Sequence, residues 1–166
     1  MKIGLIGRAI TIVALALLLG PQGRLRAEGQ WATPPPESAF SIPKTQLMQP
    51  AELNRLLHAR GAHKPLVLQV GFRMLFEEAH IPGSEYIGPA ARPEGLNQLR
   101  ERVQPLARST FIVIYCGCCP WNHCPNMGPA FHLLQSMGFT HVRALYLPDN
   151  FGADWVDKGY PAERGK

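Results

Sequence analysis

Short apolar runs alternate with amphipathic segments through the middle and the end of the chain. Residues 65–70, 110–115 and 142–147 are apolar and rich in β-formers, which is typical of buried strands, and residues 85–87 indicate a briefer strand. Apolar positions recur at helical spacing between these runs, over residues 50–61, 73–79, 96–106 and 129–137, and a last short helix is expected around Trp155. This alternation predicts an α/β fold with one domain, whose mostly parallel sheet is flanked by helices on both faces.

The N-terminal segment has a different pattern, which is typical of an export signal. Lys2 and Arg8 precede the apolar run 9–19, and Ala27 is the expected last residue of the signal. The apolar run is too short to span a bilayer, which needs about 20 apolar residues; an uncleaved anchor is the alternative interpretation. We therefore expect an exported protein, periplasmic or secreted. Its expected parts are a signal peptide over 1–27, a proline-rich linker over 28–44, one domain over 45–162 and a short tail over 163–166.

The charge distribution argues against nucleic acid as a partner. The 166-residue chain has a formal net charge of +5, but residues 1–27 carry four basic residues and no acidic one. Without that segment the net charge falls to about +1, and no run of basic residues interleaved with aromatic ones follows it. We expect neither nucleic-acid binding nor a stable membrane span in the cleaved protein. No feature of the sequence defines the oligomeric state.

The candidate chemistry is concentrated in one segment. The four cysteines of the chain, Cys116, Cys118, Cys119 and Cys124, fall within nine residues. A disulfide framework normally joins distant segments, because closing a longer loop stabilises the fold more. This cluster is too local for that purpose, so it predicts a functional site. Cys116 directly follows the strand at 110–115, and the carboxyl end of a parallel strand is where α/β sheets bind ligands.

The order of three motifs resembles that of the rhodanese (sulfurtransferase) homology domain. The motifs are the turn His80-Ile81-Pro82-Gly83, the strand and cysteine Ile112-Val113-Ile114-Tyr115-Cys116, and a closing segment with Gly138-Phe139, residues 142–147, Trp155 and Gly159-Tyr160-Pro161. The resemblance implies a five-stranded parallel sheet. It also implies an enzyme without a cofactor, which moves sulfane sulfur from thiosulfate or a polysulfide to a thiol acceptor through a persulfide on Cys116.

Two features depart from that family's pattern. Gln69 stands where the family often has an aspartate, in the strand before the His-Ile-Pro-Gly turn, and Arg73 comes later. Trp121 stands where an arginine usually closes the active loop, and the loop itself is about four residues longer. Arg73 is therefore the candidate contact for an anionic substrate, with a surface ion pair as the simpler alternative.

Physical chemistry independently favours Cys116 as the nucleophile. A loop that leads into a helix N-terminus directs backbone N–H groups inward, and these stabilise a thiolate or a persulfide. Such a setting lowers the pKa of a cysteine below its free value of about 8.5. We expect the substrate loop to include Gly117, Trp121, Asn122, His123 and Asn126, with Asn122 and Asn126 capping the helix that follows.

The remaining thiols are compatible with several roles. Cys118, Cys119 or Cys124 could resolve a Cys116 persulfide or protect Cys116 in a disulfide, and a Cys119–Cys124 disulfide could simply stiffen the loop. Soft ligands for Cu(I) or Zn(II) are also present, which gives the alternative of a non-catalytic module that binds metal or carries sulfur. The candidate ligands are Cys116, Cys118, Cys119, His123 and Cys124. A thioredoxin-type redox protein is a further alternative, but too little chain follows the cysteines for that fold.

Overall fold

Five parallel strands make up the centre of the molecule. The computed structural model describes residues 41–60 and 64–165. The strands are β1 (Leu47–Met48), β2 (Leu66–Gln69), β3 (Glu85–Tyr86), β4 (Ile112–Tyr115) and β5 (Val142–Leu145). They lie in the order β1-β5-β4-β2-β3, and every neighbouring pair is parallel. The predicted α/β class and five-stranded sheet are confirmed, and the strand that leads to Cys116 is the central one.

Helices connect the strands. They are α1 (Pro50–His58), α2 (Arg73–Glu78), α3 (Pro93–Val103) and α4 (Met127–Ser136), with short turns η2 (Lys44–Gln46) and η3 (Trp121–His123) and the π-helical turn η4 (Gly152–Val156). α1 and α3 both begin at a proline, whose missing N–H is not needed in the first helical turn. The predicted helices are all present, although α3 begins three residues before the first leucine of its apolar pattern.

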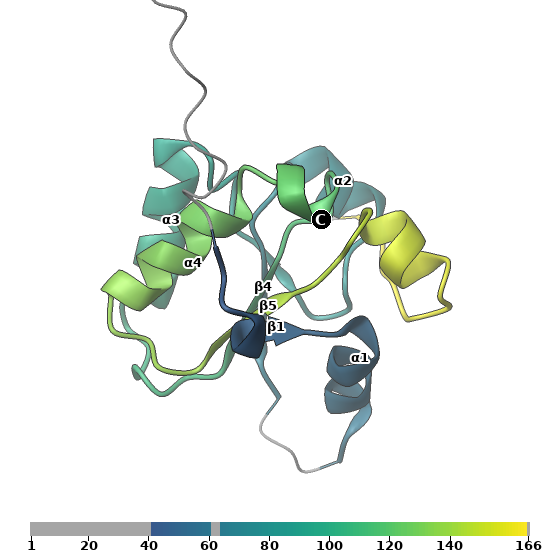
Figure 1. The fold of residues 1–166 in the computed structure, drawn as a ribbon, viewed down its shortest axis with the longest axis horizontal. Coiled ribbons are helices and arrows are strands. Elements are labelled where there is room, and N and C mark those ends of the chain that lie inside the picture. The colour runs from purple at the N-terminus through teal and green to yellow at the C-terminus, as the bar shows by residue number, and fades with distance from the viewer. Residues whose placement is uncertain (1–40, 61–63, 166) are drawn as a thin grey trace, which may run out of the picture. The chain divides into compact units, whose positions relative to one another are not determined.

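Two hydrophobic cores cover the two faces of the sheet. Along β4, Ile112 and Ile114 belong to one core, whereas Val113 and Tyr115 belong to the other. The first core contains the apolar side chains of α3 and α4, and the second contains those of α1 and η4. Figure 1 shows α3 and α4 on one side of the strands, with α1 and the yellow C-terminal segment on the other. All four β4 side chains are almost fully buried, and each such burial stabilises the fold by about 1.5–3 kcal/mol.

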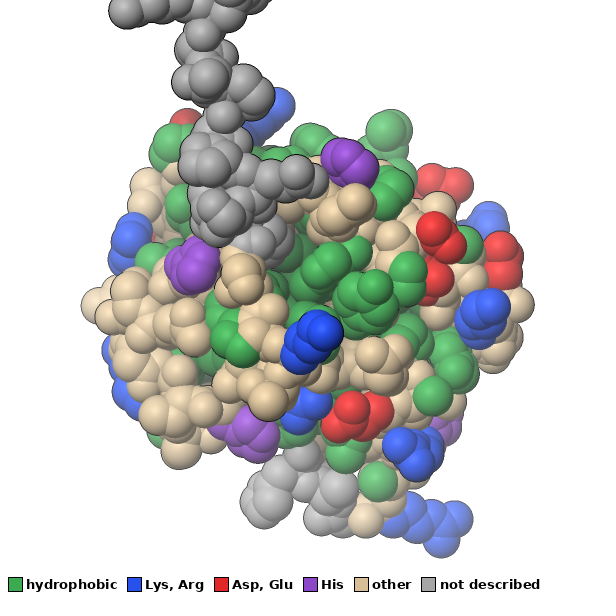
Figure 2. Space-filling view, viewed as in Figure 1, with side chains coloured by type: hydrophobic (Ala, Val, Ile, Leu, Met, Phe, Trp, Pro, Cys, Tyr) green, Lys and Arg blue, Asp and Glu red, His purple; other side chains and the backbone are tan. Residues whose placement is uncertain are grey.

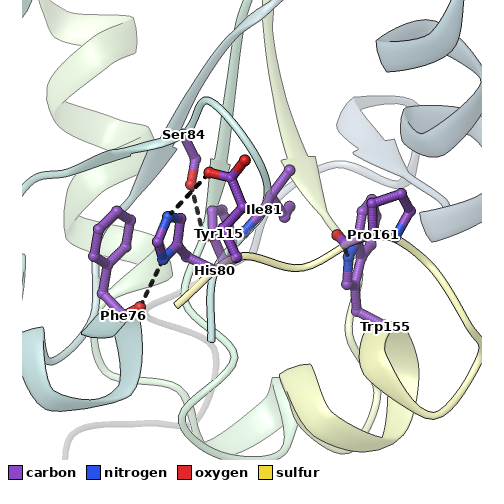
Figure 3. A network of polar contacts seen from close by, with 8 residues as sticks. Phe76, His80, Ile81, Ser84, Tyr115, Trp155 and Pro161 are labelled. Atoms are coloured by element: carbon purple, nitrogen blue, oxygen red, sulfur yellow. Dashed lines mark hydrogen bonds and ion pairs between the residues drawn. The ribbon is translucent and has the colours of Figure 1, made fainter. Parts of the chain in front are cut away.

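The end of the chain packs back onto the domain. Trp155 donates from Nε1 to the Pro161 carbonyl at 2.8 Å (Figure 3). His80 and Glu163 exchange two backbone hydrogen bonds of 2.9 Å. The N–H of Gly165 donates to a carbonyl of α2 at 2.8 Å. The His80 ring stacks on the Phe76 ring with centroids 4.0 Å apart. Residues 163–165, expected as a tail, are therefore held along α2.

The predicted signal peptide at 1–27 and most of the linker at 28–44 lie outside the described residues, so both assignments stay predictions. Within residues 41–60 and 64–165, no helix is both long and apolar enough to cross a membrane. Figure 2 shows hydrophobic side chains gathered near the middle of one face, with basic and acidic side chains around them.

Candidate active site

The cysteine loop begins with a sharp turn at the end of the central strand. Cys116 follows β4 and is 3 % exposed, and Gly117 then adopts a φ of 71°. The Gly117 carbonyl accepts a hydrogen bond from the Phe151 N–H at 3.1 Å, and a Cβ on Gly117 would lie only 2.5 Å from the Phe151 Cβ. A glycine is thus needed both for the turn and for the close approach. The loop then runs through η3 to the start of α4.

This path brings the thiols together. The Cys116 and Cys118 Sγ atoms are 3.1 Å apart, and the Cys118 and Cys119 Sγ atoms are 3.2 Å apart. The Sγ atoms of Cys116, Cys118 and Cys124 all lie within 4.8 Å of one another. All four cysteines are free thiols, so a Cys119–Cys124 disulfide is not formed in this structure.

The same thiol arrangement decides which residues suit a metal ion. Three sulfur atoms within 4.8 Å, those of Cys116, Cys118 and Cys124, are spaced so that they could meet at one soft ion. Cys119 and His123, the other two expected ligands, are not part of this group.

Asn126 holds the Cys116 sulfur from the side of α4. Its side chain is fully buried, its Nδ2 donates to the Cys116 Sγ at 3.3 Å, and its Oδ1 accepts the Ala91 N–H at 2.9 Å. Asn126 does occupy the N-cap position of α4, but it makes no side-chain cap hydrogen bond there. The expected capping role of Asn126 is therefore wrong. Its buried amide instead joins the cysteine loop to the segment before α3. Asn122, in η3, is exposed and does not cap α4 either.

Gln69 and Gly71 hold the other side of Cys116. The Gln69 Nε2 donates to the Cys116 carbonyl at 3.3 Å, and its Oε1 accepts the Gly71 N–H at 3.1 Å. An ionised aspartate could only accept hydrogen bonds, so the amide at this position makes a contact that a carboxylate cannot. A Cβ on Gly71 would lie 2.9 Å from the Cys116 Sγ, which shows how tightly the sulfur is packed.

A pocket of about 400 Å³ opens beside Cys116. Its wall includes Cys116, Gly117 and Cys118 from the loop, Gln69 from β2, and Glu78 and Arg164. Cys119 and Cys124 are not part of this wall. Gly117 is therefore the member of the predicted substrate loop, besides the cysteines, that reaches the pocket.

The other expected loop residues lie elsewhere. Trp121 lines a separate groove together with Tyr146, and their rings are 5.2 Å apart. Asn122 and His123 are exposed and, like Asn126, are not in the wall of the Cys116 pocket. Asn126 nevertheless contacts the Cys116 sulfur, as described above.

The cation of the pocket is Arg164, which sequence reasoning did not single out. Arg73, the expected anion contact, is not in the wall; its guanidinium carbon lies 4.2 Å from the centre of the Tyr86 ring, and one nitrogen lies 3.9 Å from Glu77. Arg164 reaches the pocket because the neighbouring Glu163 pairs with His80. Nothing in the local sequence of a C-terminal arginine indicates such a placement.

The protonation of the thiols differs from the expectation. Interactions with the Cys116 and Cys118 sulfurs, together with hydrogen bonds from the backbone N–H groups of Asn126 and Met127, lower the pKa of Cys124 to about 3 despite its burial. For Cys116, a hydrogen bond with Cys118 lowers the pKa, but the interaction with Cys124 and burial outweigh it and raise the pKa to about 12. The pKa of Cys118 is also raised, first of all by its hydrogen bond with Cys116.

The predicted lowering of the Cys116 pKa is therefore wrong for the fully reduced cluster. The free N–H groups at the start of α4 are directed at Cys124, eight residues further along, because the long loop places that sulfur in front of the helix. Cys116 receives a hydrogen bond from one backbone N–H, that of Cys118. Of the four thiols, Cys124 is therefore the one whose pKa these contacts lower.

These features define a class of protein: a parallel α/β domain with a buried cysteine where its central strand ends. A rhodanese-like domain family model matches residues 49–146, which is more than half of the chain, and the chain belongs to this family.

Solved structures share the fold at low sequence identity. The Alr3790 protein from Anabaena sp. has a TM-score of 0.52 and 24% identity, over 71% of this chain and 92% of that chain. The BH2092 protein from Bacillus halodurans has a TM-score of 0.54 and 20% identity, over 70% and 75%. A thiosulfate sulfurtransferase from Pseudomonas aeruginosa has a TM-score of 0.53 and 21% identity, over 72% of this chain but 20% of that chain. No curated protein matches the chain.

Proposed function

We propose that this chain is an exported sulfurtransferase. In this proposal Cys116 takes a sulfane sulfur from a small sulfur anion, thiosulfate or a polysulfide, and passes it to a thiol acceptor. The observation that carries the proposal is the position of Cys116, at the end of the central strand and in the wall of a pocket that also contains Arg164. Family membership and the shared fold support it. The apolar N-terminal run supports export.

The contacts of Cys116 suit the first half of the reaction. The Cys116 sulfur attacks the outer sulfur of thiosulfate, the S–S bond of thiosulfate breaks, sulfite leaves, and a persulfide stays on Cys116. The proton of the Cys116 thiol passes to the Cys124 thiolate, whose sulfur lies within 4.8 Å. The Asn126 amide and the Cys118 N–H then donate to the charged sulfur.

Arg164 is the group in the pocket wall that attracts the anion. Its guanidinium can donate two parallel hydrogen bonds to the oxygen atoms of thiosulfate. Glu78 lines the same pocket and limits its positive charge. An arginine in the wall attracts an anionic substrate, whereas a metal ion held by the thiolates would need no cation beside it. The pocket therefore favours a sulfur anion over a resident metal ion.

The test is a cyanide assay with thiosulfate, in which the sulfur of the persulfide leaves as thiocyanate. We expect turnover by the intact protein and background turnover by Cys116→Ser. Cys119→Ser is the matched control, because Cys119 lies outside the pocket wall, and it should keep its turnover within about twofold. Equal turnover by the intact protein and Cys116→Ser removes Cys116 from the mechanism.

Two arginine variants separate the two candidate anion contacts. Loss of a partly exposed, charge-assisted contact weakens binding by roughly threefold to tenfold, so Arg164→Gln should raise the KM for thiosulfate by that factor. A rise in KM with Arg73→Gln but not with Arg164→Gln would instead assign the anion to Arg73.

A further inference from the structure

The surroundings of Cys116 differ on its two sides. On one side Cys116 faces the pocket, and Cys118 stands beside it in the same wall. Cys124 is not in this wall; it is 7 % exposed, precedes α4 and has its sulfur within 4.8 Å of the Cys116 sulfur. A sulfur atom added to Cys116 finds space in the pocket, because Gly71 and Asn126 pack tightly against the sulfur elsewhere.

We infer that Cys124 is a resolving thiol, which displaces the sulfur of the Cys116 persulfide as hydrosulfide and leaves a Cys116–Cys124 disulfide; this inference rests on the proposed function. In the step, the Cys124 sulfur bonds to the Cys116 sulfur, the bond between Cys116 and its outer sulfur breaks, and that outer sulfur leaves with the bond's electron pair. The proton of the Cys124 thiol moves to the outer sulfur of the Cys116 persulfide anion, so the Cys124 thiolate attacks and the outer sulfur leaves as HS⁻.

The direction of attack selects Cys124 over Cys118. Displacement at sulfur needs the attacking and the leaving sulfur on opposite sides of the central one. In this inference the outer sulfur occupies the pocket, so a thiol outside the pocket wall is better placed to attack than a thiol within it, and Cys124 is not in the wall. Cys118 stands on the pocket side. A disulfide to Cys118 would also close a tight ring across Gly117, whose carbonyl is hydrogen-bonded to the Phe151 N–H.

The environment of Cys124 suits a nucleophile. The backbone N–H groups of Asn126 and Met127 donate to its sulfur, and a thiolate is the form that attacks sulfur–sulfur bonds. Cys119 is not one of the three cysteines whose sulfurs lie within 4.8 Å of one another, and its sulfur lies 3.2 Å from that of Cys118.

The step extends the activity to a complete reductive cycle. An external dithiol, entering through the pocket, attacks the exposed side of the Cys116–Cys124 disulfide and returns both cysteines to thiols, while the dithiol becomes a disulfide. The sum is thiosulfate plus a dithiol giving sulfite, hydrosulfide, a proton and the oxidised dithiol. The acceptor of the proposed sulfurtransferase is therefore a dithiol reductant, and sulfide is the product.

A single turnover without an added acceptor tests the inference. The reduced full chain is mixed with a slight excess of thiosulfate under anaerobic conditions, and sulfite, sulfide, the intact mass and the disulfide-linked peptides are followed over time. We expect sulfite first and an equal amount of sulfide later, while the persulfide mass gives way to a Cys116–Cys124 disulfide. Absence of sulfite and persulfide contradicts the proposed function. A persulfide that persists without sulfide, or a disulfide to Cys118, overturns the inference alone.

Variants loaded to equal persulfide content, measured as thiocyanate after cyanide, provide the second readout. Cys124→Ser should release sulfide at least tenfold more slowly than the intact protein, and Cys119→Ser should release it at the normal rate. Sulfide release that is lost in Cys118→Ser but kept in Cys124→Ser overturns the inference. The peptide map of the intact protein decides independently if Cys124→Ser fails to fold or to load.

Discussion

Replacement of Gly117 by alanine tests whether the cysteine loop depends on the turn described above. Gly117 has a φ of 71°, and an alanine in this region costs about 1–2 kcal/mol. The new Cβ would also lie 2.5 Å from the Phe151 Cβ and 3.1 and 3.2 Å from the backbone nitrogen and Cα of Phe151. Because backbone atoms cannot move aside, this overpacking adds about 1–3 kcal/mol. Gly117→Ala should therefore lower the free energy of unfolding by about 2–5 kcal/mol.

Gly138→Ala is the matched control. Gly138 has a φ of 85°, but a Cβ there meets no atom within 4 Å, so only the conformational cost of about 1–2 kcal/mol is expected. Urea unfolding of both variants, with the intact protein as reference, measures the difference. Equal losses of stability would refute the close packing of the loop against Phe151. In addition, Gly117→Ala should reduce persulfide formation, whereas Gly138→Ala should not, since its site lies at the far end of α4.

Three further changes test other contacts. Tyr115→Phe removes hydrogen bonds with the Ile81 N–H and the Ser84 hydroxyl and should cost about 1–2 kcal/mol at neutral pH. Burial raises the folded pKa of Tyr115 to about 12. This pKa exceeds the unfolded value of about 10. The stabilisation of the folded state by the neutral Tyr115 hydroxyl is therefore complete below about pH 10 and is lost as the pH rises toward 12. In urea unfolding, the intact protein should lose about 1 kcal/mol of its stability advantage over Tyr115→Phe between about pH 8 and about pH 11. A difference in the free energy of unfolding that stays constant over this range contradicts the raised pKa. Asn126→Ala removes the hydrogen bond to the Cys116 sulfur. It should lower the free energy of unfolding by about 2–4 kcal/mol and slow sulfite release in a single turnover. An unchanged rate of sulfite release contradicts the proposed role of the amide. Trp155→Phe removes the hydrogen bond to the C-terminal segment. It should lower the free energy of unfolding by about 1–3 kcal/mol and raise the KM for thiosulfate, because that segment positions Arg164. An unchanged KM would show that the placement of Arg164 does not depend on this hydrogen bond.

The sequence predicts the sheet well where burial leaves a continuous apolar signal. β4 and β5 are such runs, and their alternation with amphipathic helices gives the parallel topology. β1 was not predicted, because its two residues are too few to show a period; pairing of Leu47 with Ala144 of β5 defines it. The apolar pattern alone indicates four strands, and the expectation of a fifth strand rests on the resemblance to the rhodanese family.

The site was predicted less completely, because its geometry depends on contacts between distant segments. The position of Cys116 follows from the strand before it. Which sulfur receives the N–H groups of α4 depends on the path of the loop through η3, and that path directs them to Cys124. Arg164 enters the pocket only because the C-terminal residues pair with His80. Neither arrangement leaves a local pattern in the sequence.

The most direct test of the account is the location of the transferred sulfur. The reduced protein is mixed with thiosulfate, quenched with acid within the first turnover, alkylated and digested, and the cysteine peptides are weighed. We expect the mass of one extra sulfur atom on Cys116 and none on Cys118, Cys119 or Cys124 at this early time. An extra sulfur that appears first on another cysteine, or on none of the four, would contradict it.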